Sequence, residues 1–381
     1  MSSTSLEALP RTKRIFGTCF AVDCFHLGKI NGCACYFLTH FHSDHYRGLS
    51  STFSHGLIYC TSTTASLVQA VLRVTAEYLK VLELNIWYEI EACAIMLVDA
   101  NHCPGACMII CKVLATGEVH LHCGDMRADP DFVQRLQSRL GGMRCSTVYL
   151  DTTYANPLYV FPRQQQVIDK TCALVSDTVN GKCDKQKRLI PLKWLVVTCS
   201  YMIGKERLAI QLSHILGCKI YVSSFKQKLI KCIRDEGFEH EAFTNDPNET
   251  MLHLGPMEIT SKKEAEKYFQ SYCKKFTHML VVNPSGWNYN KQPSVAAQGV
   301  KWLVKERIGM ISVPYSEHSS WEELVDFVQR IPCDFLIPTV GNYGQVLRVP
   351  KESPEKALWE WHQRCTEREE SKAQQKQRDN L

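Results

Sequence analysis

Long apolar runs are missing from this sequence of 381 residues, and no run approaches the roughly 20 residues that cross a bilayer. The first ten residues contain no hydrophobic segment of the kind found in secretory signals, so we expect no such signal. An excess of one charge is missing as well, because 44 Lys and Arg against 39 Asp and Glu leave a net charge of +5. So small an excess neither indicates nor excludes a polyanionic partner. We expect no membrane partner.

Cysteine is abundant, yet the 19 cysteines form no C-x-x-C pair, so the ligand spacing of a zinc-finger module is missing. Many cysteines lie in apolar segments, where a thiol behaves as a small buried hydrophobe. Secreted disulfide frameworks are short and loop-rich, unlike this chain. The cysteines therefore predict an intracellular, reducing location.

The order of apolar runs predicts an α/β protein, and the length is enough for two or three domains. From about residue 15 to 151, short β-like runs follow one another, and several end in His or Asp. From about residue 192 to 340, strands alternate with helices. One helix begins with a predicted capping box, in which Ser320 is the N-cap and Glu323 lies three residues on. Strands that end in polar side chains can present a functional site to a cleft.

The sharpest motif is His40-Phe41-His42-Ser43-Asp44-His45. Imidazole nitrogens and carboxylate oxygens are ligands that zinc takes. In an extended segment, side chains two residues apart point the same way, so His40 and His42 can reach one ion. A bend after Ser43 would let Asp44 and His45 face a second position. The motif predicts a metal centre.

Two residues further along the chain extend this motif. His102 lies in a turn after an apolar strand, and Asp125 ends another strand. Taken alone, each is better explained by a structural role, His102 as a turn residue and Asp125 as a helix or turn cap. Together with His40 and His42, they supply the four ligands that one metal ion requires.

A second set of ligands is also predicted. His318 lies between a strand and a helix, and with Asp44, His45 and Asp125 it could hold another ion. A carboxylate can bridge two ions about 3.5–4 Å apart, as in two-metal hydrolases. We expect one or two zinc ions, with the second site weaker or occupied by Mg or Mn.

A family resemblance follows from six motifs of this sequence. They are Tyr36-Phe37-Leu38-Thr39-His40-Phe41-His42-Ser43-Asp44-His45-Tyr46, Asp99-Ala100-Asn101-His102-Cys103-Pro104-Gly105, Gly124-Asp125-Met126-Arg127, Leu150-Asp151-Thr152-Thr153-Tyr154, Ile203-Gly204-Lys205-Glu206 and Val313-Pro314-Tyr315-Ser316-Glu317-His318-Ser319-Ser320. They resemble the metallo-β-lactamase fold in its nucleic-acid-processing β-CASP branch. Within that branch they resemble the DNA cross-link-repair nucleases, a group that includes Artemis and Apollo, and above all its interstrand-cross-link exonucleases. The resemblance covers about residues 15–340.

This resemblance implies a domain organisation. The fold would be an αββα metallo-β-lactamase sandwich with an inserted β-CASP α/β domain. The expected segments are a polar leader (1–14), the first part of the metallo-β-lactamase domain (15–157), the inserted domain (158–307), the last part of the first domain (308–350) and a charged C-terminal tail (351–381).

The resemblance also implies roles for individual residues. His40, His42, His102 and Asp125 would hold the first ion, and Asp44, His45, Asp125 and His318 the second. Asp151 and His318 match two further β-CASP motifs and are predicted to be catalytic. We expect Asp44 to orient the attacking water and act as general base. His318 would stabilise charge on the scissile phosphate or hold a weak second metal.

DNA contacts are predicted at two places. A helix N-terminus with free N–H groups binds phosphate, and the strand–turn–helix from Ser200 to Glu206 would provide one. By resemblance, a pocket between this turn and Asp151 would hold a 5′-phosphate and give 5′→3′ exonuclease activity. The predicted contacts are Asp151, Thr152, Thr153, Ser200, Tyr201, Gly204, Lys205 and Ser316.

A further stretch is ambiguous in the sequence. A single-strand groove could be lined by the lysines within 226–231, 262–263 and 274–275 and by the aromatic Tyr268, Phe269 and Tyr272, although a solvated helix face explains the lysines as well.

The predicted substrate is single- or double-stranded DNA with a 5′-phosphate, in interstrand cross-link repair. Val340 stands where RNA-processing relatives carry His, which favours DNA, and Asn283 replaces an Arg of the close relatives. The alternatives are a structure-specific endonuclease of Artemis type, an RNA endonuclease, a zinc hydrolase of small molecules such as β-lactams, and a non-catalytic scaffold. A nuclear location, a monomeric state and contacts with repair or replication proteins are expected.

Overall fold

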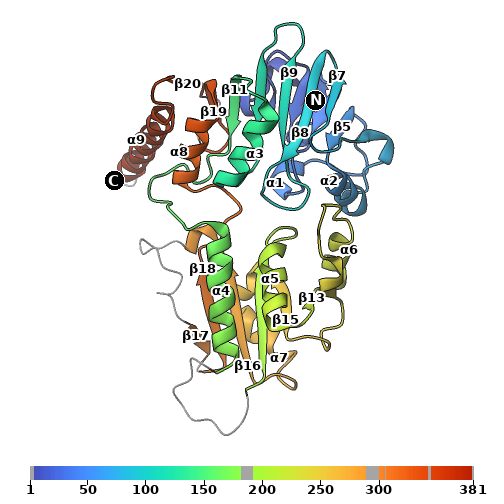
Figure 1. The fold of residues 1–381 in the computed structure, drawn as a ribbon, viewed down its shortest axis with the longest axis vertical. Coiled ribbons are helices and arrows are strands. Elements are labelled where there is room, and N and C mark those ends of the chain that lie inside the picture. The colour runs from blue at the N-terminus through green and yellow to red at the C-terminus, as the bar shows by residue number, and fades with distance from the viewer. Residues whose placement is uncertain (1–3, 182–191, 289–299, 305, 342–344, 380–381) are drawn as a thin grey trace. The chain divides into compact units, whose positions relative to one another are not determined.

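The computed structural model describes residues 4–181, 192–288, 300–304, 306–341 and 345–379. The chain divides into two compact units (Figure 1). Unit 1 consists of Met1–Tyr159 and His318–Leu381, and unit 2 of Val160–Glu317. No helix among the described residues is both long enough and apolar enough to span a membrane.

Unit 1 contains two larger sheets. The order of the first is β20-β19-β11-β10-β9-β8-β7, and that of the second is β2-β4-β5-β6. The strands of the first are β7 (Trp87–Ile90), β8 (Cys93–Asp99), β9 (Cys107–Val113), β10 (Val119–His122), β11 (Cys145–Leu150), β19 (Cys333–Pro338) and β20 (Leu347–Arg348). The strands of the second are β2 (Phe20–Val22), β4 (Cys35–Phe37), β5 (Leu57–Cys60) and β6 (Leu79–Val81). Strands β1 (Thr4–Ser5) and β3 (Ile30–Asn31) form a separate, short parallel pair.

The core of unit 1 lies between these two sheets. Alternate residues of β8, such as Ile95 and Leu97, pack with Phe20 of β2 and Phe37 of β4, as the two-residue period of a strand requires. Figure 1 shows α3 (Pro130–Leu140) and α8 (Trp321–Arg330) against the first sheet, and α1 (Ser43–Tyr46) and α2 (Ser62–Leu67) on the side of the second. The αββα sandwich expected from the sequence is confirmed.

Unit 2 is built on one sheet with the order β14-β13-β15-β12-β16-β18-β17. All of its pairings are parallel except that of β17 with β18. The strands are β12 (Trp194–Ser200), β13 (Ile220–Tyr221), β14 (Phe243–Thr244), β15 (Leu252–Pro256), β16 (His278–Pro284), β17 (Lys301–Val304) and β18 (Ile308–Val313). The helices are α4 (Gln164–Val179), α5 (Glu206–Leu216), α6 (Ser224–Ile230) and α7 (Lys262–Gln270). Every residue of β12 is buried, which is typical of a central strand in a parallel sheet.

The second boundary between the units differs from the one expected after residue 307. Unit 2 runs on to Glu317, because β18 pairs with β16 from Met279↔Ile308 to Pro284↔Val313. Strand β18 is thus part of the parallel sheet of unit 2, whereas the sequence resemblance assigned it to the other domain.

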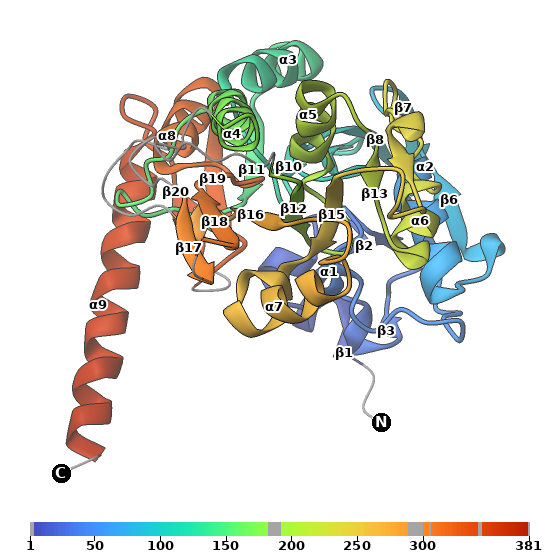
Figure 2. The same ribbon diagram turned by 90° about the horizontal axis from the view of Figure 1, so that it is seen from below.

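The expected charged tail is largely helical. Helix α9 (Lys356–Asp379) begins with apolar side chains, and Ala357, Leu358 and Trp361 are buried. The rings of Trp359 and Trp321 of α8 lie 4.7 Å apart between centroids. Figure 2 shows α9 as one unbroken helix whose first turns lie beside α8.

Candidate metal centre

The predicted metal motif begins just after strand β4. His42 has an extended backbone and is the N-cap of α1, and Nε2 of His40 lies 3.0 Å from Nδ1 of His42. The predicted bend after Ser43 is present as the single turn of α1, which contains Asp44 and His45.

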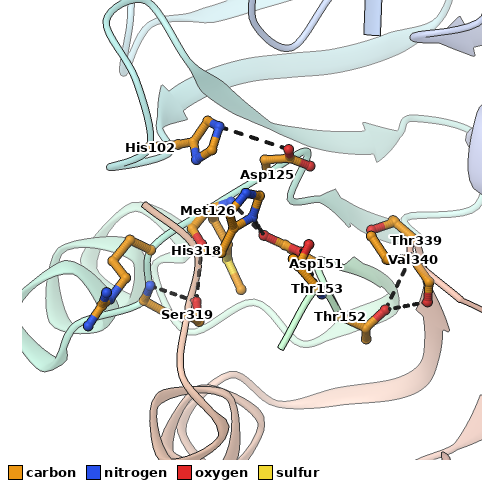
Figure 3. Close-up of polar contacts among 12 residues, drawn as sticks. His102, Asp125, Met126, Asp151, Thr152, Thr153, His318, Ser319, Thr339 and Val340 are labelled. Carbon is orange, nitrogen blue, oxygen red and sulfur yellow. Dashed lines mark hydrogen bonds and ion pairs between the residues drawn. The ribbon is translucent and has the colours of Figure 1, made fainter. Parts of the chain in front are cut away.

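His102 and Asp125 reach this motif from two other strands, in the loops after β8 and β10. Nε2 of His102 lies 3.2 Å from Nδ1 of His42 and 3.9 Å from Oδ2 of Asp125, and Figure 3 shows His102 and Asp125 facing one another. Nε2 of His40 lies 3.7 Å from the same oxygen. One ligand atom from each of these four residues lies within 4.8 Å of the others. The structure therefore brings together the four residues predicted for the first ion.

Two glycines let the loops approach the motif. Gly105 has a φ of +77°, and a Cβ there would lie 2.7 Å from the side chain of Thr63. Gly124 has a φ of +56°, and its Cβ would lie 2.9 Å from Cβ of Thr39. Any other residue would be strained in this backbone region and would push the loop away.

A second group forms beside the first from Asp125, Asp151 and His318, whose ligand atoms lie within 4.8 Å of one another. Oδ2 of Asp151 lies 2.8 Å from Nδ1 of His318 and accepts a hydrogen bond from N of Met126. Oδ1 accepts hydrogen bonds from N and Oγ1 of Thr153, at 3.0 and 2.7 Å. Figure 3 shows Asp151 between His318 and Thr153.

The membership of this second group differs from the predicted set. Asp151 belongs to it, whereas His45 and Asp44 do not. Nε2 of His45 is 3.4 Å from Oδ2 of Asp125 and 3.6 Å from Oδ2 of Asp44. The side chain of Asp44 is 76% exposed, so it is close to the centre and accessible to solvent.

Asp23 is a residue of this site that the sequence reasoning missed. It follows β2 with a φ of +49°, and its Oδ2 lies 2.7 Å from Nδ1 of His45. It also accepts hydrogen bonds from N and Oγ1 of Thr39, and Oγ1 of Thr39 lies 3.0 Å from Nδ1 of His40. The sequence contained a signal for it, because Asp23 comes directly after an apolar strand. Asp125 and Asp151 also come after apolar strands.

Burial and neighbouring charges set the protonation of the centre. Burial, with His45 and His42 nearby, lowers the pKa of His40 well below its usual value. Burial alone would also lower the pKa of His45, but Asp125 and Asp23 raise it well above the usual value. His45 in turn holds the pKa of Asp125 well below that of an ordinary carboxyl, against the effect of burial. At neutral pH His40 is therefore neutral and Asp125 ionised, the forms that bind a metal ion.

The start of α8 is fixed to the loop after β10, and this fixes His318. N and Oγ of Ser319 both donate to the carbonyl of Met126, at 3.1 Å each. Nε of the fully buried Arg127 lies 2.8 Å from Oε2 of Glu323. The predicted capping box between Ser320 and Glu323 is confirmed.

The predicted phosphate contacts in unit 1 are bonded within the protein. Oγ1 of Thr152 donates to the carbonyl of Val340 and accepts from its N–H, at 2.8 and 3.1 Å, as Figure 3 shows. The hydroxyl of Thr153 donates to Asp151. Asp151 is a buried carboxylate, and its charge opposes a phosphate. Of these groups, Asp151 is the one that contacts His318.

The turn before α5 also differs from the predicted phosphate site. N of Gly204 donates to Oε2 of Glu206 at 2.8 Å, and N of Lys205 donates to Oε1 of Glu317 at 2.6 Å. Burial, with Glu206 nearby, raises the pKa of Glu317 to about 7. Carboxyl groups of the protein therefore occupy the N–H groups that were predicted to bind phosphate.

Polar side chains of this turn and its neighbours are buried as well. Nζ of Lys205 donates to the carbonyl of Pro284 at 2.6 Å, and Lys205 is 5% exposed. Ser200 and Ser316 are buried as well. The ammonium of Lys205 is therefore bonded within the protein rather than exposed, and among the predicted contacts of unit 2 Tyr201 is the exposed side chain, at 53%.

Comparison with known proteins gives a family match and several relatives. Residues 238–344 match a family model described as DNA repair metallo-beta-lactamase. The chain is 35% identical over 363 residues to the DNA cross-link repair protein SNM1 of Arabidopsis thaliana, which covers 95% of this chain and 72% of that protein. It is 37% identical over 354 residues to the DNA cross-link repair 1A protein of Mus musculus, covering 92% of this chain and 32% of the mouse protein. It is 27% identical over 347 residues to the 5′ exonuclease Apollo of Danio rerio, covering 88% of this chain and 54% of the fish protein.

Proposed function

Because the chain belongs to the SNM1 family of DNA cross-link repair nucleases with the metallo-β-lactamase fold, we propose that it is a zinc-dependent 5′→3′ DNA exonuclease of interstrand cross-link repair. The observation that carries the proposal is the convergence of His40, His42, His102 and Asp125 from three separate strands. The 5′ polarity is taken from the fish relative, which is named a 5′ exonuclease.

The residues present fit a divalent ion of the zinc class. Three imidazole nitrogens and one carboxylate oxygen are donors that zinc takes, and the lowered pKa of His40 keeps that ring in its ligand form. Asp125, Asp151 and His318 would hold a second ion, which is zinc, Mg or Mn. A bound ion supplies positive charge to the phosphodiester and lowers the pKa of a water that it binds from 15.7 to about 7.

The protein's own groups have separate tasks in hydrolysis. The carboxylate of Asp44, exposed beside His45, orients the attacking water and accepts its proton. When no second ion is bound, His318 stabilises the charge that develops on the scissile phosphate. Asp151 acts through His318, since it holds Nδ1 of that ring at 2.8 Å and leaves the other ring nitrogen for the substrate. Positioned groups of this kind typically contribute 10²–10⁴-fold to a rate.

The test uses DNA labelled at one end, single- or double-stranded, with either a 5′-phosphate or a 5′-hydroxyl. We expect mononucleotides to be released from the 5′ end, faster with the 5′-phosphate, and activity to disappear with a chelator and return with zinc. Cleavage at an internal junction would instead support the endonuclease alternative. Equal rates on DNA with a 5′-phosphate and DNA with a 5′-hydroxyl would contradict the expected preference for the 5′-phosphate. Failure to cleave DNA with zinc, Mg or Mn added would overturn the proposal.

The setting in the cell follows from the substrate. An enzyme that digests chromosomal DNA at cross-links works in the nucleus, where it meets repair or replication proteins, and we propose that it acts as a monomer. Fluorescence microscopy of a tagged protein checks the location, and sedimentation checks the monomeric state.

A further inference from the structure

Three exposed aromatic side chains follow three parallel strands of the unit 2 sheet. Tyr201 follows β12, Phe225 lies in α6 just after β13, and Trp287 follows β16. They are 53%, 52% and 64% exposed. Figure 1 draws these strands in green to orange. Exposed aromatics that gather at the ends of neighbouring strands are candidates for binding, whereas exposed apolar residues scattered singly are not.

Sheet order places these side chains along one edge. The strands run β13-β15-β12-β16 and are parallel, so their carboxyl ends lie on the same side. Neighbouring strands are about 4.8 Å apart, so the ends of β13 and β16, from which Phe225 and Trp287 follow, lie about 14 Å apart. Ligands of open α/β sheets bind at the carboxyl ends of strands. We call these three side chains the aromatic row.

Two buried lysines hold the backbone beneath the row. Nζ of Lys205 lies 4.3 Å from the centroid of the Tyr201 ring and donates to the carbonyl of Pro284, which precedes Trp287 by three residues. Nζ of Lys226, next to Phe225, donates to the carbonyls of Tyr201 and Met202 at 3.1 and 2.9 Å. The three segments are therefore tied together before any ligand arrives.

Positive charge accompanies the row. Lys228 and Lys231 of the α6 segment are exposed. Phe225 and Lys228 lie three residues apart on a helix, so their side chains share a face. No acidic residue occurs from Ser224 to Arg234. This side of the row attracts an anion.

We propose that the aromatic row binds the bases of single-stranded DNA while Lys228 and Lys231 contact its phosphates, an inference that rests on the proposed function. Unpaired bases stack on aromatic side chains, and a positive groove follows the backbone. The bases of a duplex are already stacked, so the row selects unpaired strands.

The position differs from that of the groove considered from the sequence. Phe269 is buried, and the hydroxyl of Tyr268 lies 2.9 Å from Nδ1 of the buried His253. Tyr272 packs against the same ring, at 4.9 Å between centroids. Those aromatics belong to the core of unit 2, and of the lysines in 226–231 the exposed ones accompany Phe225 instead.

The test measures binding of a fluorescent single strand by the full chain in a chelator, where no cleavage occurs. We expect Tyr201→Ala and Phe225→Ala each to raise Kd about 10-fold for the normal strand. The same variants should change Kd less than about 2-fold for a blunt duplex and for an abasic strand, which offers no base to stack. Trp87→Ala is the matched control, since Trp87 is also exposed but lies on β7 of unit 1. Lys228→Gln and Lys231→Gln should each reduce the slope of log K against log salt by about 0.7.

Unchanged affinity of the aromatic variants would overturn the inference and leave the surface to a protein partner. An equal loss on normal and abasic strands would overturn it too, because stacking would then not be involved. These results are independent of the proposed function, which is tested by cleavage with the unaltered protein. Base-dependent binding without DNA cleavage would contradict the proposed function but support binding of bases by the aromatic row. DNA cleavage without base-dependent binding would support the proposed function but contradict the role of the row.

Discussion

Oδ2 of Asp23 lies 2.7 Å from Nδ1 of His45, and Nε2 of the same ring lies 3.4 Å from Asp125. One carboxylate therefore decides which nitrogen of His45 faces the metal centre. The same carboxylate binds Thr39, whose hydroxyl lies 3.0 Å from His40. Asp23 thus acts on two rings of the site although it is not among the predicted ligands.

Asp23→Asn should weaken metal binding about 10–100-fold, because Asp23 acts through the hydroxyl of Thr39 on the ring of the ligand His40, and such outer groups orient a ligand ring and raise its basicity. Competition with a chromophoric chelator measures the affinity directly. Asp334→Asn is the control, since Asp334 is about half exposed and pairs with Arg144 at the surface. Affinities within a factor of two of the unaltered protein would contradict the role of Asp23.

Asp44→Ala should reduce DNA cleavage by about 10²–10⁴-fold, the usual effect of removing a general base. The side chain is 76% exposed, so the midpoint of thermal unfolding should stay within about 1 °C. Single-turnover cleavage and a thermal melt of the same preparation check both statements. Near-normal cleavage by a folded variant would remove Asp44 from the mechanism.

Glu323→Gln should destabilise unit 1 by about 3–5 kcal/mol, the usual effect of removing one member of a buried ion pair, because it takes away the carboxylate 2.8 Å from Nε of the buried Arg127. Gln can still form the capping box with Ser320, so the variant isolates the ion pair. Arg144→Met at the exposed pair with Asp334 should cost less than about 1 kcal/mol. Urea unfolding gives both values, and similar losses in the two variants would refute the distinction.

Acid should destabilise unit 2 through His253. Burial lowers the pKa of His253 from 6.5 to about 4, so at pH 5 the unfolded chain binds a proton that the folded chain does not. Stability is therefore fully present above pH 6.5 and falls as the pH drops towards 4, by up to about 3 kcal/mol.

His253→Gln should flatten the dependence of the urea midpoint on pH between 7 and 4. Tyr268→Phe is its control, because it removes the hydroxyl 2.9 Å from Nδ1 but keeps the titrating ring. An unchanged pH slope in His253→Gln would show that another group is responsible.

Local sequence was enough to predict the features that depend on residues close together in the chain. The α1 turn after His42, the capping box at Ser320 and the strands that end at metal-ligand candidates all follow from residues a few positions apart. Such features depend on backbone geometry over one or two turns, which spacing and residue type report.

The errors arose where distant segments compete for the same groups. Lys205 was predicted to contact phosphate, yet its ammonium donates to the carbonyl of Pro284, 79 residues further along the chain. Its backbone N–H donates to Glu317, 112 residues further along. The residues near a lysine in the sequence do not predict that its side chain will be buried against a carbonyl from a distant segment. The boundary after 307 failed similarly, because the pairing of β18 with β16 is a long-range contact.

The amino-acid sequence by itself determined the kind of chemistry, since it supplies the imidazoles and carboxylates of a metal centre and the alternating pattern of an α/β protein. Only the tertiary structure decided how they are grouped. It put Asp151 with Asp125 and His318, placed Asp23 behind His45, and left Tyr201 exposed while it buried Lys205. Ligand identity is a property of single residues, but proximity is set by sheet pairing and loop packing between segments far apart in the chain.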